Sequence, residues 1–483
     1  MLLVMIRKEI LESLLSSRFT ISSLLCLSLI PLGFYANLKG YEQALSDYLQ
    51  SVQIYESSMK GNPNINFQGE GYRSPSAFII FSTGFENILP TKIITSRDKG
   101  VEILNTRGTD NSLSLLFGKV DLAFVVTSII SLLALVLIFD SISGEKENGT
   151  LKVILSNPVS RSSILLSKLI GNCFVLMIPF MVAISIGFLI LSVSGTISPW
   201  QSDFFTRFIL IIATTLLFIF CFFLVGILVS TLTSRSITAL IGVLFLWVIL
   251  AIIFPRASTM MAEVIYPVKS QQVVETEKAF QKESIEKEKD KRLRLLYDRA
   301  AIEFNENPNS ISVGPEQTPL QKTYNQRKVP IETEYNEKVQ RELNRIENDF
   351  LREKKIQDAI ARNIARLSPV SCYTFIVSEL ACTGSLQALQ FLQDVQRFYE
   401  KIQEEVYSHF RIETYGSSGG ATASRINTDP DIPKKENMSR FQTHFVPISI
   451  VWDKVWVDFL LLCLYCLAFF AIAYFSFLLY DAR

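Results

Sequence analysis

The stretch DSISGEKENGTLKVILSNPVSRSSILLSK, residues 140–168, is a charged segment between two long apolar runs. Gly149 permits a sharp turn, and Pro158 cannot continue a helix because it lacks an amide donor. Ser160 or Ser162 could cap a helix that follows the proline. The segment therefore predicts two short amphipathic helices that are joined by bends and lie against a membrane face.

Six apolar runs surround this segment, and each is long enough, or nearly so, to cross a bilayer. A transmembrane helix needs about 20 apolar residues to span roughly 30 Å of hydrocarbon. The runs cover residues 19–35, 122–139, 169–193, 208–232, 237–254 and 459–479. Charged residues concentrate outside them. This division predicts a mainly α-helical protein with six transmembrane helices and large water-exposed segments.

The distribution of basic residues predicts the orientation of the spans, because cytoplasmic loops are enriched in Lys and Arg. The short loop 194–207 offers only Arg207. The basic residues on the opposite side are Arg7, Lys8, Arg18, Lys146, Lys152, Arg161, Lys168, Arg235 and Arg483. We therefore expect both termini and residues 140–168 to lie in the cytoplasm.

Residues 1–18 have the pattern of an amphipathic helix at the cytoplasmic interface. One helical stripe is apolar and is formed by Leu3, Ile6, Ile10 and Leu14. The alternative is a cleaved signal peptide, with residues 19–35 as its apolar core and Ala36 as the cleavage point. Two glutamates precede the apolar run, which is unusual for the basic leader of a signal peptide. We therefore favour the retained helix.

Two large segments are left on the outer side of the membrane, residues 36–121 and 255–458. The first begins with a helical pattern and then turns polar and rich in Gly and Pro at 61–76. Strands are expected after that, at 77–82 and 92–95.

The second outer segment contains two charged helical patterns at about 270–366, separated by a Pro-, Asn- and Gly-rich break at 305–330. Two helices of about 35 residues, each about 50 Å long, would form an antiparallel hairpin with a narrow apolar seam. The residues of that seam would be Val274, Phe280, Ile285, Leu293, Leu296, Ala300, Phe304, Tyr335, Val339, Leu343, Ile346 and Phe350. A further helix is expected at 386–410 and an exposed polar loop at 416–436.

The string within residues 140–168 resembles the coupling run GEKExGTLxxxLSxPxxRxxxLxxK of type-2 ATP-binding-cassette exporter permeases. The matching residues are Glu145, Glu147, Gly149, Thr150, Leu151, Leu155, Pro158, Arg161 and Lys168. The resemblance implies a cytoplasmic coupling element that docks on a separate ATPase subunit, with ATP bound by that partner. Glu145 and Glu147 would then meet basic residues of the ATPase, and Leu151 with Leu155 would fill its apolar groove.

The rest of the chain resembles a bacterial subgroup of these permeases that carries a large extracytoplasmic insertion before its last transmembrane helix. The features that carry this resemblance are LFGKVDLAFVV at 116–126, Leu-Ser-Pro at 367–369, Thr-Gly at 383–384 and the terminal YDAR. The resemblance implies a location in the bacterial inner membrane. It also implies a pair of permease subunits, identical or different, that works with two ATPase subunits.

The sequence carries no recognisable catalytic set. No GxxxxGK[ST] phosphate loop occurs, and the GSSGG at 416–420 has no lysine after it. His409 and His444 lack Cys or His partners at metal-ligand spacing, and CLYC at 463–466 lies inside an apolar run. We therefore expect no enzyme activity, no cofactor and no metal. A net charge of +1 gives no support to nucleic-acid binding.

Cys372 and Cys382 lie outside the apolar runs and could form a disulfide if their region faces an oxidising compartment. If the region is helical, however, positions ten apart lie about 15 Å from each other, which is too far for a bridge. The helical interpretation is the favoured one.

These observations predict the permease subunit of a bacterial exporter that is driven by a separate ATPase and embedded in the lipid bilayer. The alternative is a mechanotransmission protein with the same ATPase coupling, whose outer hairpin acts on a periplasmic protein while no substrate crosses. A third hypothesis is a membrane-anchored receptor or scaffold without an ATPase. The sequence leaves the cargo open.

Overall fold

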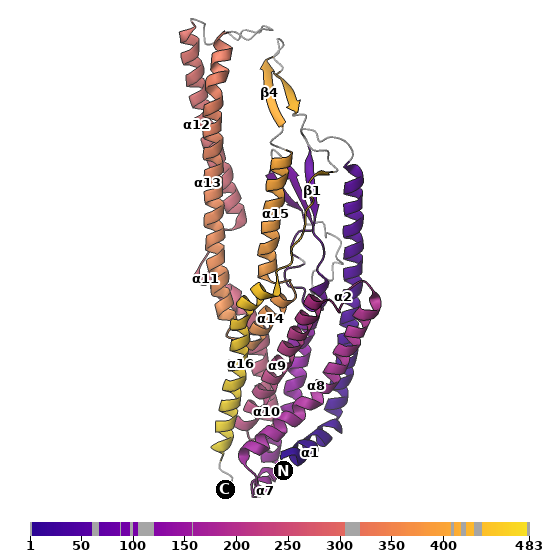
Figure 1. Ribbon diagram of the computed structural model, residues 1–483. Helices are drawn as coiled ribbons and strands as arrows, with labels where there is room; N and C mark the ends of the chain where they lie inside the picture. The colour runs from indigo at the N-terminus through magenta and orange to yellow at the C-terminus, as the bar shows by residue number, and fades with distance from the viewer. Residues whose placement is uncertain are drawn as a thin grey trace. The chain divides into compact units, whose positions relative to one another are not determined.

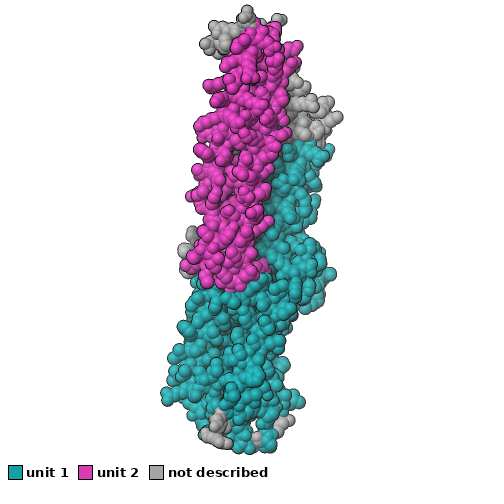
Figure 2. Space-filling view, turned by 90° about the vertical axis from the view of Figure 1, so that its left-hand side faces the viewer, with its two compact units in different colours: residues 1–257, 365–407, 433–483 teal, residues 258–364, 408–432 magenta. Residues whose placement is uncertain are grey.

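The computed structural model is mainly helical (Figure 1). It describes residues 2–59, 67–86, 88–96, 100–104, 120–156, 158–304, 319–406, 410–416, 422–428 and 437–480. Most of LFGKV, residues 305–318 of the break predicted at 305–330, His409, most of GSSGG and the terminal Arg483 lie outside these residues. The chain divides into two compact units, one of residues 1–257, 365–407 and 433–483 and the other of residues 258–364 and 408–432 (Figure 2).

The first unit is a helical bundle with a small sheet. Its helices are α1 (Leu2–Leu14), α2 (Ser17–Ser58), α4 (Leu122–Phe124), α5 (Ser131–Ile138), α6 (Ser143–Glu147), α7 (Thr150–Ser156), α8 (Arg161–Ser194), α9 (Ser202–Leu232), α10 (Ser236–Val248), α14 (Pro369–Leu380), α15 (Ser385–Glu405) and α16 (Ile448–Leu478). Two π-helical segments, η2 (Val125–Ile130) and η3 (Ile249–Ile253), continue α4 and α10. The central helix is α9, since it contacts α5, α8, α10, α14 and α16.

Within the described residues, seven helical segments are long and apolar enough to cross a membrane. They are Ser17–Ser58, Leu122–Glu147, Arg161–Ser194, Ser202–Leu232, Ser236–Ile265, Pro369–Glu405 and Ile448–Leu478. Six of these contain the six runs expected from the sequence. The seventh, Pro369–Glu405, lies in the part of the chain that was expected outside the membrane, so the number of candidate spans exceeds the six predicted crossings by this one segment.

The seventh segment is divided into α14 and α15 by a bend at 381–384, where Cys382 has a φ of 51°. Alone, α14 has 12 residues and is about 18 Å long, shorter than the roughly 30 Å of a hydrocarbon core. Its side chains are nevertheless buried against α9 and α16. Its apolar character therefore has a second explanation besides a crossing, which is packing within the bundle.

The long helix α2 corrects one prediction. The sequence suggested a span at 19–35 followed by a separate outer helix, but a single helix of 42 residues runs through both, with Pro31 inside it. The side-chain amide of Asn37 donates to the carbonyl oxygen of Gly33 at 3.0 Å and to that of Val120 at 2.8 Å. These bonds fasten α2 where the sequence suggested that the helix would end.

The small sheet has the order β1 (Gln68–Tyr72), β2 (Lys92–Ser96), β3 (Gly100–Leu104), with both pairs antiparallel. The strand expected at 92–95 is confirmed. The one expected at 77–82 is wrong, because Ala77–Ile80 forms a 3-10 helix, η1. Strand β1 falls where glycines suggested turns. Its Gly69 is instead needed for close packing, since a Cβ there would lie 2.5 Å from Oγ1 of Thr95.

The second unit contains α12 (Gln271–Glu303) and most of α13 (Pro319–Ala365), with α11 (Phe254–Ile265) entering it from η3. A separate antiparallel pair is formed by β4 (Phe410–Gly416) and β5 (Thr422–Thr428). Three predictions are corrected here. Pro330 lies inside α13 rather than in a break, the helix expected at 386–410 ends at Glu405, and a strand lies within the loop expected at 416–436.

Four ion pairs join α12 to α13: Lys278–Glu347 at 2.5 Å, Glu288–Lys338 at 2.7 Å, Arg292–Glu334 at 3.1 Å and Glu303–Arg327 at 2.9 Å. Residue numbers rise along α12 while those of the partners fall along α13, so the helices run in opposite directions. Val274, Ile285 and Tyr335 are buried in this hairpin, but Phe280 is 67% exposed. Six residues after Val274, Phe280 lies about 240° around the helix and faces away from the seam.

Candidate functional site

Residues 140–160 fold as the two short helices expected from the sequence. Helix α6 ends at Glu147, and Gly149 has a φ of 73°, the left-handed conformation that glycine adopts readily. Helix α7 follows, and Oγ of Ser160 then caps α8 by accepting from the amide of Ser163 at 3.3 Å. Asn157 lies outside the described residues. We call residues 140–160 the elbow.

Glu145 is bound inside the chain. Its Oε1 lies 2.6 Å from Nζ of Lys168 on α8, which also donates to Oε1 of Glu9 on α1 at 3.0 Å. The exposed fractions of the Lys168, Glu9 and Glu145 side chains are 5%, 13% and 17%. The other oxygen of Glu145, Oε2, is buried without a hydrogen-bond partner within the described residues. This Lys168 triad joins the elbow to α1 and α8.

Lys146 binds the end of α9. Its Nζ donates to the carbonyl oxygens of Thr231 and Thr233, the latter at 3.1 Å, and lies 4.9 Å from the ring centroid of Tyr480. The last carbonyl groups of a helix lack intrahelical donors and favour a nearby cation. Lys146 therefore satisfies this end of α9.

A second contact joins α9 to the start of the elbow. Oγ of the buried Ser230 accepts from the backbone amides of Ile142 and Ser143, both at 3.0 Å. One turn earlier, a Cβ on Gly226 would lie 2.3 Å from Cγ2 of Ile138, so α5 and α9 are in close contact there. These contacts hold the first residues of the elbow against α9, the central helix.

Glu147 and Arg161, two further charged residues of the motif, bind α10 and α16. Oε2 of Glu147 accepts from the amide of Ser236, the first residue of α10, at 2.9 Å. Nη1 of Arg161 donates to the carbonyl oxygens at the end of α16, those of Phe477 at 3.1 Å, Leu478 at 2.7 Å and Tyr480 at 2.9 Å. A carboxylate at a helix start and a cation at a helix end are the arrangements that helix dipoles favour.

Helices α1 and α2 are fastened beside the elbow at three more points. Nη1 of Arg18, in the first turn of α2, lies 2.8 Å from Oδ2 of Asp140. Oγ of Ser13 donates to Oδ1 of Asn172 at 2.9 Å. A Cβ on Gly171 would lie 2.7 Å from Cβ of Glu9, so this glycine lets α1 approach α8 closely.

The remaining residues of the motif divide between the interior and the surface. Leu151 is fully buried in the chain's own core and Leu155 is half-buried against it. The exposed side of the elbow is formed by Glu147, Asn148, Gly149, Thr150, Lys152, Val153, Ser156 and Pro158, and Val153 is 66% exposed. We call these exposed residues the elbow surface.

The contacts of Glu145, Glu147, Leu151 and Leu155 with an ATPase stay a prediction from the sequence. Within the chain, Glu145 pairs with Lys168 and Leu151 is buried, whereas Glu147 accepts from Ser236 and remains exposed. An amphipathic pattern shows that one face of a helix is buried, but not whether its own chain or another covers it. The roles of Glu9, Lys146 and Ser230 were not predicted from the sequence. Of the residues in these contacts, only Lys168 could have been recognised, since a charge at the start of an apolar run requires a partner.

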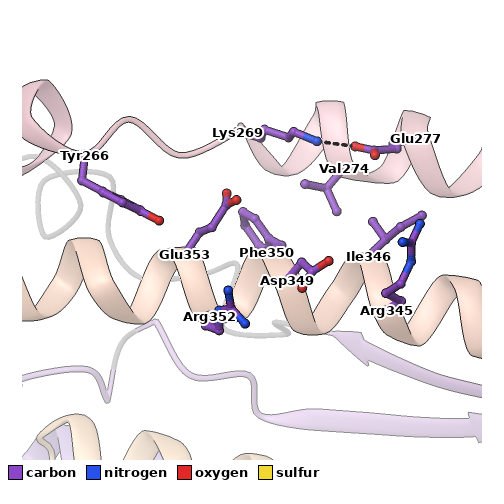
Figure 3. A pocket seen from close by; sticks show the side chains of 10 residues that line it. All are labelled: Tyr266, Lys269, Val274, Glu277, Arg345, Ile346, Asp349, Phe350, Arg352 and Glu353. Atoms are coloured by element: carbon purple, nitrogen blue, oxygen red, sulfur yellow. Dashed lines mark hydrogen bonds and ion pairs between the residues drawn. The ribbon is translucent and has the colours of Figure 1, made fainter.

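A pocket in the second unit lies between the start of α12 and α13 (Figure 3). This pocket, about 340 Å³ in volume, is lined by Tyr266, Lys269, Val274, Glu277, Arg345, Ile346, Asp349, Phe350, Arg352 and Glu353. Lys269, just before α12, lies 2.8 Å from Glu277 on α12, along one wall of the pocket. Three cationic and three acidic side chains line the pocket, so its charges give no preference for an anion or a cation.

The cysteines and acidic residues form no further site in the part of the chain that is described. All seven cysteines are free thiols in this structure, Cys372 and Cys382 among them. No cluster of His, Cys, Asp and Glu there has the geometry to hold a metal ion.

These features define the class of the protein: a polytopic helical membrane protein whose distinctive site is a pair of short helices bonded to the ends of its long helices. The family model described as "ABC-2 family transporter protein" matches residues 3–482, and the chain therefore belongs to this family of ABC transporter permeases. This membership confirms the resemblance found in the sequence.

A curated relative is the "Probable ABC transporter permease protein NosY" of Stutzerimonas stutzeri. It is 42% identical to the chain over 67 residues, which are 14% of this chain and 23% of the relative. The match therefore spans less than a quarter of the relative's length.

Proposed function

We propose that the chain is the membrane-spanning permease subunit of a bacterial ABC exporter, and that a separate ATPase subunit drives it through residues 140–168. The observation that carries this proposal is the bonding of the elbow. Three charged residues of α6 each bind a different long helix: Glu145 binds Lys168 of α8, Lys146 binds the end of α9, and Glu147 binds the start of α10. Arg161, the first residue of α8, binds the end of α16.

This bonding makes the elbow suited to transmit force. A displacement of α6 would move the ends of α8, α9 and α10 together, because each is joined to α6 by a direct polar contact. The end of α16 would follow α8, to which it is joined through Arg161. Packed helices respond to such a displacement by switching between discrete arrangements rather than by deforming gradually. ATP-driven closure of the ATPase would in this way alternate access between the two sides of the membrane.

The contact with the ATPase is assigned to the elbow surface. Leu151 and Glu145 hold the elbow in place from inside, while Val153 and Pro158 present an exposed apolar area beside the polar Lys152 and Ser156. Exposed apolar residues rimmed by polar ones mark protein interaction sites. The motif residues therefore have two roles, docking for the exposed ones and positioning for the buried ones.

The expected setting is the bacterial inner membrane, with both termini and the elbow in the cytoplasm. The bias of Lys and Arg towards that side supports the orientation. A second permease subunit and a pair of ATPase subunits would complete the transporter, and the outer segments could bind a periplasmic protein. Family membership favours transport over mechanotransmission. Accumulation of a cargo by sealed inverted vesicles would separate these two functions.

The test is a substitution on the elbow surface. Val153→Glu places a carboxylate in the proposed apolar contact and should weaken co-purification of the ATPase from mild detergent at least about tenfold. ATPase activity of the eluate should fall with it. Val329→Glu is the matched control, because Val329 is 61% exposed on α13 and lies outside the elbow. Equal ATPase recovery with both variants would refute the docking role.

A further inference from the structure

Helix α1 has two apolar faces, and only one of them is covered. Met5 packs against the bundle core, and the close approach of Glu9 to Gly171 identifies the covered side. The other side carries the exposed apolar residues Leu3 (80%), Val4 (72%) and Leu11 (51%), and the exposed Leu15 (88%), directly after the end of α1, extends it. These four positions lie within about 120° of one another around a helix, so they form one continuous face. We call it the outward face of α1.

The charges near this face indicate what covers it. Arg7 is exposed among the four apolar residues and has no ion-pair partner within the described residues. Lys8, at the edge of the face, pairs with Glu12 at 3.4 Å. A helix with an apolar face and basic residues beside it lies in the headgroup region of a membrane. The guanidinium of Arg7 can then bind a lipid phosphate with two parallel hydrogen bonds.

The position of the outward face supports the same occupant. Ser16 joins α1 directly to α2, a candidate membrane span, and the exposed Ile21 and Leu24 follow within the first two turns of α2. The outward face of α1 is therefore continuous along the chain with an apolar surface that lipid would cover.

The other side of α1 is joined to the elbow. Glu9 and Glu145 bind the same ammonium group of Lys168, at 3.0 Å and 2.6 Å, in a site from which water is largely excluded. If α1 moves, Glu9 must either take Lys168 with it or leave that cation with a single partner. A buried ion pair resists the second outcome, because it would leave the carboxylate of Glu9 without the cation that compensates its charge.

We propose that α1 is a lipid-responsive lever. Its outward face docks in the cytoplasmic leaflet, Arg7 binds the phosphate of anionic lipids, and the Lys168 triad passes the position of α1 to the elbow. The lipid composition of the membrane thereby sets how firmly the elbow is held. The consequence for ATP-driven coupling rests on the function proposed above, whereas the consequence for the elbow itself does not.

The experiment compares the full chain, assembled with its ATPase, in nanodiscs of phosphatidylcholine alone and of an equal mixture with phosphatidylglycerol. Hydrogen–deuterium exchange of residues 140–156 should be slower in the anionic membrane. One cationic residue near an anionic surface contributes a factor of roughly five to membrane binding, so Arg7→Gln should remove about a fivefold difference in exchange rate. Arg341→Gln, at an exposed position of α13, is the matched control and should leave the difference intact.

A second variant separates docking from transmission. Glu9→Gln keeps the outward face but weakens the triad, so exchange of α1 should still respond to anionic lipid while that of the elbow should not. An elbow that exchanges equally in both membranes in the unaltered protein would overturn the proposal. So would an equal response of the Arg7 and Arg341 variants.

The ATPase rate in the same samples distinguishes the two proposals. ATPase stimulation that is equal in both membranes, with no lipid effect on exchange, refutes the lever and leaves the proposed function standing. A lipid-dependent elbow without any ATPase stimulation supports the lever and refutes the proposed function.

Discussion

The ion pairs of the elbow and those of the α12–α13 hairpin use the same residue types in opposite environments. In the Lys168 triad the cation is 5% exposed and is shared by two carboxylates from different helices. In the hairpin, Arg292 and Glu334 are 48% and 56% exposed. Hydrogen bonding to Lys338 lowers the pKa of Glu288 there, yet both side chains remain in water.

The difference shows where a charge substitution has consequences. Removing one partner of a buried pair leaves the other charge without water or a counter-ion, which is strongly destabilising. Removing one partner of an exposed pair lets water replace it, and such pairs contribute little. Substitutions in the two regions should therefore differ in their effect on stability, with the buried pairs the most sensitive.

The largest effect is expected from Lys168→Met, which leaves the carboxylates of Glu9 and Glu145 buried and facing each other. Loss of one partner from a buried pair costs about 3–5 kcal/mol. The yield of monodisperse protein in detergent and its thermal midpoint should both fall sharply. The combined variant Lys168→Met, Glu9→Gln, Glu145→Gln should recover most of the loss, since no unpaired charge remains. If the combined variant is no better than the single one, burial of charge is not the cause.

An intermediate effect is expected from Arg161→Gln, which removes a cation from the carbonyl groups at the end of α16. Hydrogen bonds from charged groups contribute about 1.5–3 kcal/mol. Amides near the end of α16 should exchange faster, and ATPase stimulation should fall while the ATPase still co-purifies. The control is Arg235→Gln, at an exposed position before α10. Unaltered exchange at the end of α16 would contradict the assigned contact.

The smallest effect is expected from Arg292→Gln in the hairpin. Because Arg292 and Glu334 both stay hydrated, the thermal midpoint and the helix content should match those of the unaltered protein within error. Circular dichroism during heating is sufficient to test this. A loss comparable to that of the Lys168 variant would remove the contrast between the two regions.

Much of the local structure could be predicted from the sequence. The apolar runs located six of the candidate spans, and the Gly149 turn followed from local backbone chemistry. Ser160 and Ser162 were both possible caps for α8, and Ser160 is the residue that caps it. Predictions from residue type and spacing were wrong where a residue fits more than one structural role. The glycines of β1 looked like turn residues but serve close packing, and Phe280 was assigned to the seam although it faces water.

The class of the protein, the positions of its apolar helices and the bent shape of the elbow could be read from the amino-acid sequence alone. These depend on composition, periodicity and residues that favour or prevent particular backbone angles, all of which act over a few neighbouring residues. The partner of each charged residue in and beside the elbow, by contrast, depends on the tertiary structure. Glu9 and Lys168, or Arg161 and Leu478, are distant along the chain. Their pairing depends on which helices pack together, because a buried charge must take whichever partner the packing brings within reach.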